Sequence, residues 1–186
     1  MISKKIILTI AAFALLLIGA ACGLTGCIGE SGGTNTPAGG DVVKGLPPDP
    51  GKAGKATLAG IDSDNDGVRD DIQRYIVLNN LDSAKIRAAL TRYAKAMQDE
   101  ILSVEKGKSA SIDATYTGNR AQECIWFTLG SIESGEDYRI SLEKEMLNTP
   151  DRIATYKKYN VSLSGQSFGL TPDDQLATNC AIDPTK

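Results

Sequence analysis

The apolar residues of this chain recur at spacings of three and four from about residue 58 onward, which is the period of an amphipathic helix. Shorter stripes predict helices over residues 72–79, 121–132, 138–146 and 150–160, and alternation typical of strands is weak throughout. The longest stripe consists of Ile86, Leu90, Tyr93, Met97, Ile101 and Val104. The pattern therefore predicts an all-α fold, with a single domain of about five helices over residues 58–186.

Residues typical of helix ends suggest where the helices begin. Asp82 is expected to cap the long second helix. A polar loop is expected over residues 105–118, after which Asn119 caps the third helix. The pair Ser134-Gly135 is expected to separate the third helix from the fourth helix.

Two further starts are predicted nearer the C-terminus. Thr149 is expected to cap the fifth helix, with Pro150 at its first position, where the missing N–H of proline has no cost. The run from Thr171 to Asp174 predicts one more short turn before the end of the chain.

The N-terminus has a different pattern. Lys4 and Lys5 precede an apolar run over residues 6–21. This arrangement is typical of a secretory signal, and the run is short for a membrane-spanning helix. The next residues, Leu24-Thr25-Gly26-Cys27, resemble the lipobox of bacterial lipoproteins. The resemblance implies a signal peptide over residues 1–26 and a lipid anchor on Cys27.

The residues around this box bear on where the protein would be sorted. Ile28 rather than aspartate follows the cysteine, which by the same resemblance implies the outer membrane, on its periplasmic or surface face. Cys22 is a second candidate for lipidation, but Gly19 stands where the box requires an aliphatic residue. The alternative to a lipoprotein is an ordinary secretory signal or an uncleaved anchor.

Cleavage would change the charge and the cysteine content. The whole chain has 20 basic and 23 acidic residues, a net charge of −3. The signal peptide contains two of the lysines and no acid, so the mature chain would have 18 basic and 23 acidic residues, a net charge of −5. Cys124 and Cys180 would remain, and an even pair in an exported protein predicts a disulfide. The alternative is two buried free thiols.

Residues 27–57 are rich in Gly, Ser, Thr and Pro. A segment of this composition buries little apolar surface, so we expect a lipid-anchored flexible linker between the anchor and the domain.

The segment that follows carries the most specific chemistry. Five aspartates fall within ten residues, with alternate spacing before Gly67: Asp62, Asp64, Asp66, Asp70 and Asp71. Carboxylates a few Å apart repel each other by about 1 kcal/mol per pair even at the dielectric of water, unless a cation lies between them. Oxygen-only ligands on a flexible loop favour Ca²⁺ over Mg²⁺. A solvated turn, with two aspartates favouring a helix N-terminus, is the alternative.

The spacing Asp-x-Asp-x-Asp-Gly-x-x-Asp, from Asp62 to Asp70, resembles the calcium loops of thrombospondin type 3 repeats. It is also similar to EF-hand, dockerin and Excalibur loops. The resemblance implies side-chain ligands from Asp62, Asp64 and Asp66 and a carbonyl ligand from Val68. Position twelve is Gln73 rather than the bidentate glutamate of an EF-hand, so Asp70 or Asp71 is expected to close the site. An Arg69 at position eight is a second departure.

The composition narrows the function. An acidic chain lacks the basic face of a nucleic-acid binder, and a chain without histidine excludes Ser-His-Asp and Cys-His catalysis and His-ligated zinc. We therefore expect a lipid-anchored envelope protein with a calcium-stabilised domain, acting as a structural module or as a binding module for an envelope protein partner.

Two alternatives remain open. The first is a hydrolase that uses a Ser–Lys dyad or paired carboxylates, Glu123 with Glu133 or Glu136. The second is a small-ligand carrier with a pocket between helices, lined by Trp126, Phe127 and Tyr138.

Overall fold

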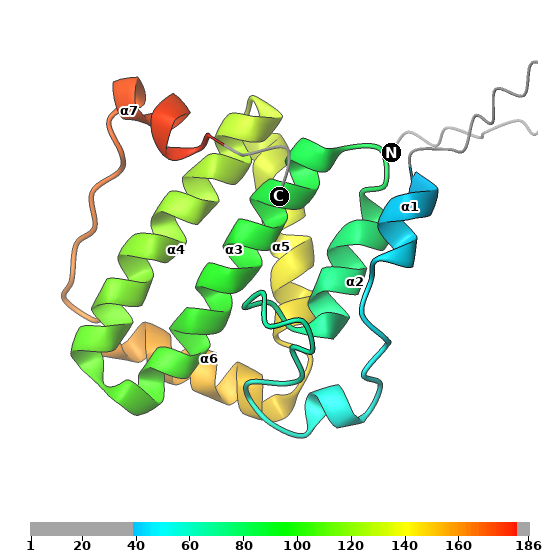
Figure 1. Ribbon diagram of the computed structural model, residues 1–186. Coiled ribbons are helices and arrows are strands. Elements are labelled where there is room, and N and C mark those ends of the chain that lie inside the picture. Colours follow the sequence, from blue (N-terminus) through cyan, green and yellow to red (C-terminus); the bar gives the residue numbers. More distant parts are fainter. Residues whose placement is uncertain (1–38, 182–186) are drawn as a thin grey trace, which may run out of the picture. The chain divides into compact units, whose positions relative to one another are not determined.

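The longest apolar stripe forms the central helix of the fold. The computed structural model describes residues 39–181, and every regular element within that range is helical, which confirms the all-α prediction (Figure 1). Helix α3, Ala84–Ser103, is capped by the Ser83 side chain, which accepts a hydrogen bond from the N–H of Ile86, rather than by the predicted Asp82. Its apolar face, including Leu90, Met97 and Ile101, lies in the core.

The other long helices pack around α3. Helix α4, Lys108–Leu129, lies beside it over most of its length, and α5, Ile132–Met146, contacts both (Figure 1). Helix α2, Asp70–Asn79, and helix α6, Pro150–Ser162, complete the five helices expected from the pattern. The structure adds one short helix, α1, Gly39–Lys44, and two 3-10 turns, Ala53–Lys55 and Val104–Lys106.

The predicted loop over residues 105–118 is wrong, because α4 begins at Lys108 and runs through Asn119. Two small polar residues on its first turns, Ser111 and Thr115, and the glycine Gly118 are buried. The Thr115 hydroxyl donates to the Ser111 carbonyl oxygen at 2.8 Å, and the Ser103 and Ser111 hydroxyls lie 3.0 Å apart. The hydroxyl groups are hydrogen-bonded within this interface, and the short side chains let α3 and α4 approach closely. A helix face with a polar sequence is therefore buried here.

The predicted interruption at Ser134-Gly135 is also wrong. Ser131 caps α5 by accepting from the N–H of Ser134, so the pair lies inside the first turn of that helix. A methyl group on Gly135 would lie 3.1 Å from the Cα of Trp126, so this glycine allows close packing of α5 on α4.

The predictions nearer the C-terminus are confirmed. Thr149 caps α6 with Pro150 at its first position. Helix α7, Asp173–Asn179, follows the 171–174 run and packs on α4. Cys124 and Cys180 form a disulfide, with their Cα atoms 5.1 Å apart.

The segment before the acidic loop is part of the folded domain. Helix α1, Gly39–Lys44, packs on α2, and Arg74 donates to the carbonyl oxygen of buried Pro47 at 2.9 Å. Gly54 is buried as well. The domain contacts therefore extend N-terminal to residue 58, the boundary expected from composition, because arginine side chains of the helices bind the backbone carbonyls of a segment that has few apolar side chains.

The predicted signal peptide, the predicted lipidation site Cys27 and the predicted linker up to residue 38 lie outside the described residues. Within residues 39–181, no helix combines the length and the apolar character needed to cross a membrane.

Candidate functional site

The acidic loop connects the N-terminal segment to α2. Two residues with positive φ turn the chain, Asn65 at 58° and Gly67 at 89°. Arg69 is the extended N-cap residue of α2, so Asp70 and Asp71 occupy the first turn of that helix, where the helix dipole favours negative charge.

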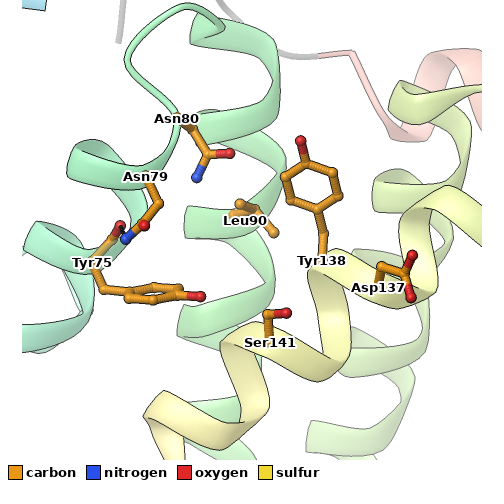
Figure 2. A pocket seen from close by; sticks show the side chains of 7 residues that line it. All are labelled: Tyr75, Asn79, Asn80, Leu90, Asp137, Tyr138 and Ser141. Atoms are coloured by element: carbon orange, nitrogen blue, oxygen red, sulfur yellow. Dashed lines mark hydrogen bonds between the residues drawn. The ribbon is translucent and has the colours of Figure 1, made fainter. Parts of the chain in front are cut away.

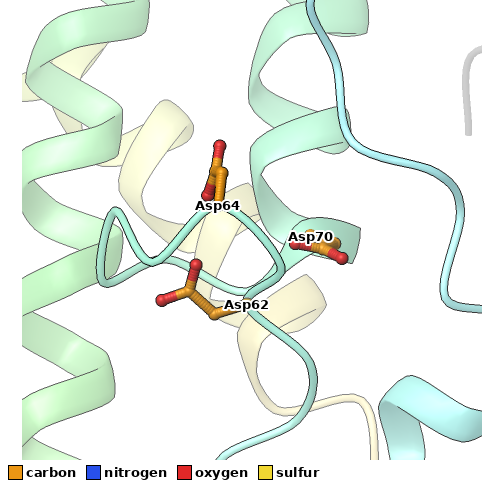
Figure 3. A group of neighbouring side chains, drawn as sticks. All are labelled: Asp62, Asp64 and Asp70. Carbon is orange, nitrogen blue, oxygen red and sulfur yellow. The ribbon is translucent and has the colours of Figure 1, made fainter.

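Three of the aspartates come together. One carboxylate oxygen from each of Asp62, Asp64 and Asp70 lies within 4.8 Å of the other two, an arrangement that could hold a metal ion (Figure 3). Asp70 is buried, Asp62 is partly buried and Asp64 is exposed. The group therefore has a buried base and a side open to solvent.

Backbone N–H groups of the loop fix two of these carboxylates. Asp62 accepts from the N–H of Asp66 at 3.2 Å and from the N–H of Gly67 at 2.9 Å. Asp70 accepts from the N–H of Ser63 at 2.8 Å. The loop is thus wrapped around its acidic side chains, and the orientation of the acids follows from the turn.

Other predicted ligands have different surroundings. Asp66 accepts from the N–H of Val68 at 2.7 Å and from Gln73 at 3.3 Å. The Val68 side chain lies in the hydrophobic core. Asp71 binds Arg69 and accepts from Asn148 at 3.0 Å. Asp62, Asp64 and Asp70 form the acidic group, and Asp71 faces the buried arginine instead.

The charges around the loop shift two pKa values in opposite directions. The hydrogen bond from Gln73 lowers the pKa of Asp64. Partial burial, together with the charges of Asp64 and Asp62, raises the pKa of Asp66. Lys95 contributes a nearby positive charge and donates to the Asp66 carbonyl oxygen at 3.2 Å.

Beneath the loop lies Arg69, only 1% exposed. Its guanidinium binds the Asp71 carboxylate through Nε at 3.0 Å and Nη2 at 3.3 Å. It also donates to the Gln98 side chain at 3.2 Å and to the Met146 carbonyl oxygen at 3.3 Å. Burial alone would raise the pKa of Asp71, but the hydrogen bonds and charge of Arg69 outweigh it and lower that pKa. The arginine joins the loop to α3 and to the end of α5.

A second buried arginine, Arg152 of α6, anchors the segment before the loop. It donates to the carbonyl oxygens of Gly54 at 2.8 Å, Thr57 at 2.9 Å and Leu58 at 3.3 Å. It also donates to Asn148, whose amide in turn donates to Asp71. The two arginines therefore belong to one network. Sequence reasoning treated the first only as a departure from a motif and missed the second.

The described structure also contains a buried acid that the sequence analysis did not single out. Glu100 of α3 is 7% exposed, and burial raises its pKa to about 8. Its carboxyl group contacts Gly118 and hydrogen-bonds Tyr159. Glu100 follows Met97 by three residues and precedes Val104 by four, so its place on the apolar stripe was the available signal.

The acids considered for catalysis have separate partners. Glu123 is buried, and its Oε1 accepts from the N–H of Thr171 at 2.9 Å. Glu136 binds Arg139 and accepts from the Trp126 indole N–H at 3.3 Å. Glu133 is exposed. Glu123 is thus hydrogen-bonded to the segment before α7, and Glu136 is hydrogen-bonded to Trp126.

A small open cavity of about 200 Å³ lies between α2, α3 and α5. Figure 2 shows Leu90 between the side chains of Tyr75 and Tyr138, with the side chains of Asn79 and Asn80 beside them at the end of α2. Of the three aromatic residues expected to line a pocket, Tyr138 does so, whereas Trp126 binds Glu136 and Phe127 is half exposed. The lining residues are Tyr75, Asn79, Asn80, Leu90, Asp137, Tyr138 and Ser141.

Comparisons with known proteins add no family to this description. The chain matches no protein-family model, and neither a curated protein nor a solved structure is significantly similar to it.

Proposed function

We propose that this chain is a lipid-anchored protein of the bacterial cell envelope whose helical domain is stabilised by Ca²⁺ and acts as a binding or structural module. The observation that carries the proposal is the convergence of Asp62, Asp64 and Asp70 within 4.8 Å. Mutual repulsion opposes such a group unless a cation offsets it.

The donor set favours a hard cation. Every side-chain donor of the group is a carboxylate oxygen, which Ca²⁺ and Mg²⁺ both accept. Ca²⁺ tolerates irregular geometry and six to eight oxygens at about 2.3–2.6 Å, whereas Mg²⁺ needs a near-ideal octahedron. A loop that offers three carboxylates, with Asp66 and the carbonyl of Val68 within the same turn, suits Ca²⁺ better.

The position of the loop suggests a structural role for the ion. Arg69 follows the acidic turn directly and contacts α3 and the end of α5, so an ion that fixes the turn also fixes these contacts. We expect a Kd of about 10⁻⁴–10⁻³ M, the range of extracellular calcium modules.

Thermal unfolding of the purified full-length protein tests the calcium proposal. The melting temperature should be higher in 2 mM Ca²⁺ than in EDTA, and Mg²⁺ at the same concentration should have a smaller effect. The same melting temperature in Ca²⁺ and in EDTA would remove calcium from the proposal.

The lipid anchor rests on the lipobox resemblance alone and has its own test. Mass spectrometry of the N-terminal peptide, purified from bacterial membranes, should show Cys27 as the first residue and carrying acyl groups. An unmodified Cys27 thiol would contradict the anchor but leave the calcium proposal intact.

A partner in the envelope would need an exposed surface on the domain. Phe127, near the end of α4, is 49% exposed, and Ile132, at the start of α5, is 64% exposed. A photoreactive residue at position 132 should crosslink to one envelope protein in intact cells, whereas the same residue at the exposed position of Asp113 should not. Equal crosslinking from both positions would argue against a specific partner at this turn.

A second candidate function, a small-ligand carrier, is favoured by the cavity between α2, α3 and α5. Its base is apolar at Leu90, and Tyr75 and Tyr138 provide two aromatic surfaces with a hydroxyl each. Native mass spectrometry of the protein from its host should then reveal a bound small molecule that Tyr75→Ala releases. Identical masses for the native and denatured protein would exclude a retained ligand.

A further inference from the structure

A second, larger cavity lies next to the one between α2, α3 and α5. It is an open cleft of about 570 Å³ between α2, the turn over residues 49–55 and the end of α5. Tyr75 and Asn79 of α2 line both cavities, so the two are neighbours across these side chains. A cleft of this volume has room for a small organic ligand.

The cleft carries charges of both signs on different walls. Lys52 and Lys55 belong to the turn over residues 49–55, whereas Glu145 lies in the last turn of α5. No ion pair joins these three side chains among the described residues. A ligand that itself carries charges of both signs could therefore pair with each wall.

The other two acids of the cleft are already engaged. Asp71 binds Arg69, so its charge is balanced from beneath. Asp49 accepts from the N–H of Gly51 at 2.9 Å within the turn. Glu145 is exposed and has no described hydrogen bond to its carboxylate, which makes it the acid available to a ligand.

An aromatic ring lies near this available acid. Burial, together with the charge of Glu145, raises the pKa of Tyr75, which shows that the carboxylate and the phenol interact. An ammonium group beside both would gain charge attraction from Glu145 and cation–π attraction from the Tyr75 ring. This part of the cleft therefore suits the cationic end of a ligand.

Arg74 is the cation of the cleft with the most fixed position. It is half-buried, and its Nη1 donates to the carbonyl oxygen of buried Pro47 at 2.9 Å. The described contacts leave its Nε and Nη2 edge available, and the two N–H groups of such an edge match the two oxygens of a carboxylate. Arg74 and the two lysines therefore suit the anionic end of a ligand.

We propose that this cleft binds a short peptide by its two charged ends, the ammonium at Glu145 and Tyr75 and the carboxylate at Arg74, Lys52 and Lys55. A free amino acid carries the same two charges, but the volume of the cleft favours a peptide of two or three residues. The site includes none of the three converging aspartates of the acidic loop, so the inference goes beyond the proposed function and does not require calcium.

The groups between the charges favour a peptide over other zwitterions. Asn79 donates through Nδ2 to the Tyr75 carbonyl oxygen at 2.8 Å, which leaves its Oδ1 to accept from a peptide N–H. The neighbouring Leu78 gives the cleft an apolar surface for a side chain. A phosphoethanolamine lipid headgroup has both charges but neither an amide nor a side chain.

NMR titration of the isotope-labelled full-length protein with dialanine tests the proposal. We expect a Kd below about 5 mM, and binding of free alanine that is at least about fivefold weaker. N-acetyl-dialanine lacks the ammonium, and dialanine amide lacks the carboxylate. Each should bind at least about tenfold more weakly than dialanine, because each loses a charge-assisted interaction.

Neutral variants assign the two ends of the ligand. Glu145→Gln should bind dialanine and N-acetyl-dialanine equally, within about twofold, and still discriminate against the amide. The double variant Lys52→Gln/Lys55→Gln should lose at least about threefold of the discrimination against the amide and keep that against the acetylated peptide. All three side chains are exposed, so the melting temperatures should stay as in the wild type.

Matched controls come from the turn between α3 and α4. Glu105→Gln and the double variant Lys106→Gln/Lys108→Gln remove the same charges at exposed positions outside the cleft. Both should bind all the probes as the wild type does.

Three results would overturn the inference. The first is no binding of dialanine or trialanine at about 5 mM, even where Ca²⁺ raises the melting temperature. The second is full discrimination against N-acetyl-dialanine by Glu145→Gln, which would place the ammonium elsewhere. The third is tighter binding of free alanine or of glycerophosphoethanolamine than of either peptide, which would assign the cleft to an amino acid or a lipid headgroup. A melting temperature that ignores Ca²⁺ would contradict the calcium proposal and leave this one standing.

Discussion

Two acidic regions of this domain balance their charge in opposite ways. In the loop, three carboxylates converge on a side that is open to solvent, and backbone N–H groups hold them there. Between α3 and α4, Glu100 stands alone in the interior, with no ion pair to an arginine or lysine among the described contacts. A carboxylate group with one side open to solvent can take a cation from solution, whereas an acid enclosed between helices takes a proton, which explains why the pKa of Glu100 is raised to about 8.

The stability of the domain is therefore expected to depend on divalent cations through the loop and on pH through Glu100. A cation bound by the loop only in the folded protein would make folding sensitive to divalent cations, because such an ion stabilises the folded state by mass action. Glu100 makes folding sensitive to pH. The arginine beneath the loop is what keeps Asp71 charged inside the domain, and Glu100 has no such counterion.

Removing that arginine is the most damaging change. Arg69→Met should lower the free energy of unfolding by about 3–5 kcal/mol, because it leaves the partly buried Asp71 carboxylate without its counterion. It also leaves the Gln98 oxygen without its donor. Urea unfolding measures the loss, and Arg120→Met, at an exposed position of α4, provides the control. A loss below about 1 kcal/mol would show that Asp71 does not depend on Arg69.

The pH dependence of stability tests the other region. The folded protein keeps a proton on Glu100 up to about pH 8, whereas the unfolded chain releases it near the ordinary value of 4.5. Folding therefore takes up a proton between these values, and stability falls by up to about 1.4 kcal/mol per unit as the pH rises through that window. The expected loss between pH 5 and pH 8 is a few kcal/mol, reduced by whatever water reaches the site.

Glu100→Gln should abolish this slope and make the protein more stable than the wild type at pH 8. Other groups that face the carboxyl group, Glu143 of α5 and Tyr156 and Tyr159 of α6, remain in the variant and so do not account for a difference. Urea unfolding at pH 5, 6.5 and 8 measures it, with Glu105→Gln as the exposed control. Parallel slopes for Glu100→Gln and wild type would show that Glu100 is ionised when folded.

The sequence predicted the elements whose signals are local. The stripe of α3 and the Thr149-Pro150 start of α6 depend on neighbours within one or two turns, and both are confirmed. Asn119 failed as a helix start because burial of Ser111 and Gly118 against α3 outweighs their polar character. That packing is a contact between distant segments, which a periodicity of apolar residues does not register.

For the candidate site too, the sequence predicted the local feature but not the one that depends on distant contacts. The alternation of Asp62, Asp64 and Asp66 predicted an acidic centre, and two of these three belong to the group that forms. What the sequence could not reveal is which of Asp70 and Asp71 joins this group. Asp70 and Asp71 are adjacent and chemically identical, and only the position of Arg69, fixed by Gln98 and the end of α5, decides that Asp71 turns away.

A methyl group on Gly118 tests how tightly the interior holds Glu100. The added carbon would overlap the Glu100 carboxyl group, so Gly118→Ala should cost about 1–3 kcal/mol. Gly169→Ala is the control, because its methyl group meets nothing within 4 Å. In a Glu100→Ala background the cost of Gly118→Ala should shrink, since the overlapping group is gone. An unchanged cost there would place the strain elsewhere.

The smallest effect separates Asp64, a member of the acidic group, from Asp71, which binds Arg69. Asp64→Asn removes a member of the acidic group, so the rise in melting temperature on adding Ca²⁺ should disappear. For a Kd near 10⁻⁴–10⁻³ M, 2 mM Ca²⁺ should stabilise the wild type by about 0.6–1.8 kcal/mol, or roughly 1–7 °C.

Asp71→Asn should behave differently, because its carboxylate binds Arg69 and Asn148 rather than the acidic group. This variant should melt at a lower temperature both in EDTA and in Ca²⁺, and the difference between the two conditions should stay as in the wild type. If instead Asp71→Asn abolishes the calcium-dependent rise and Asp64→Asn keeps it, Asp71 binds the ion and the division between Asp64 and Asp71 is reversed.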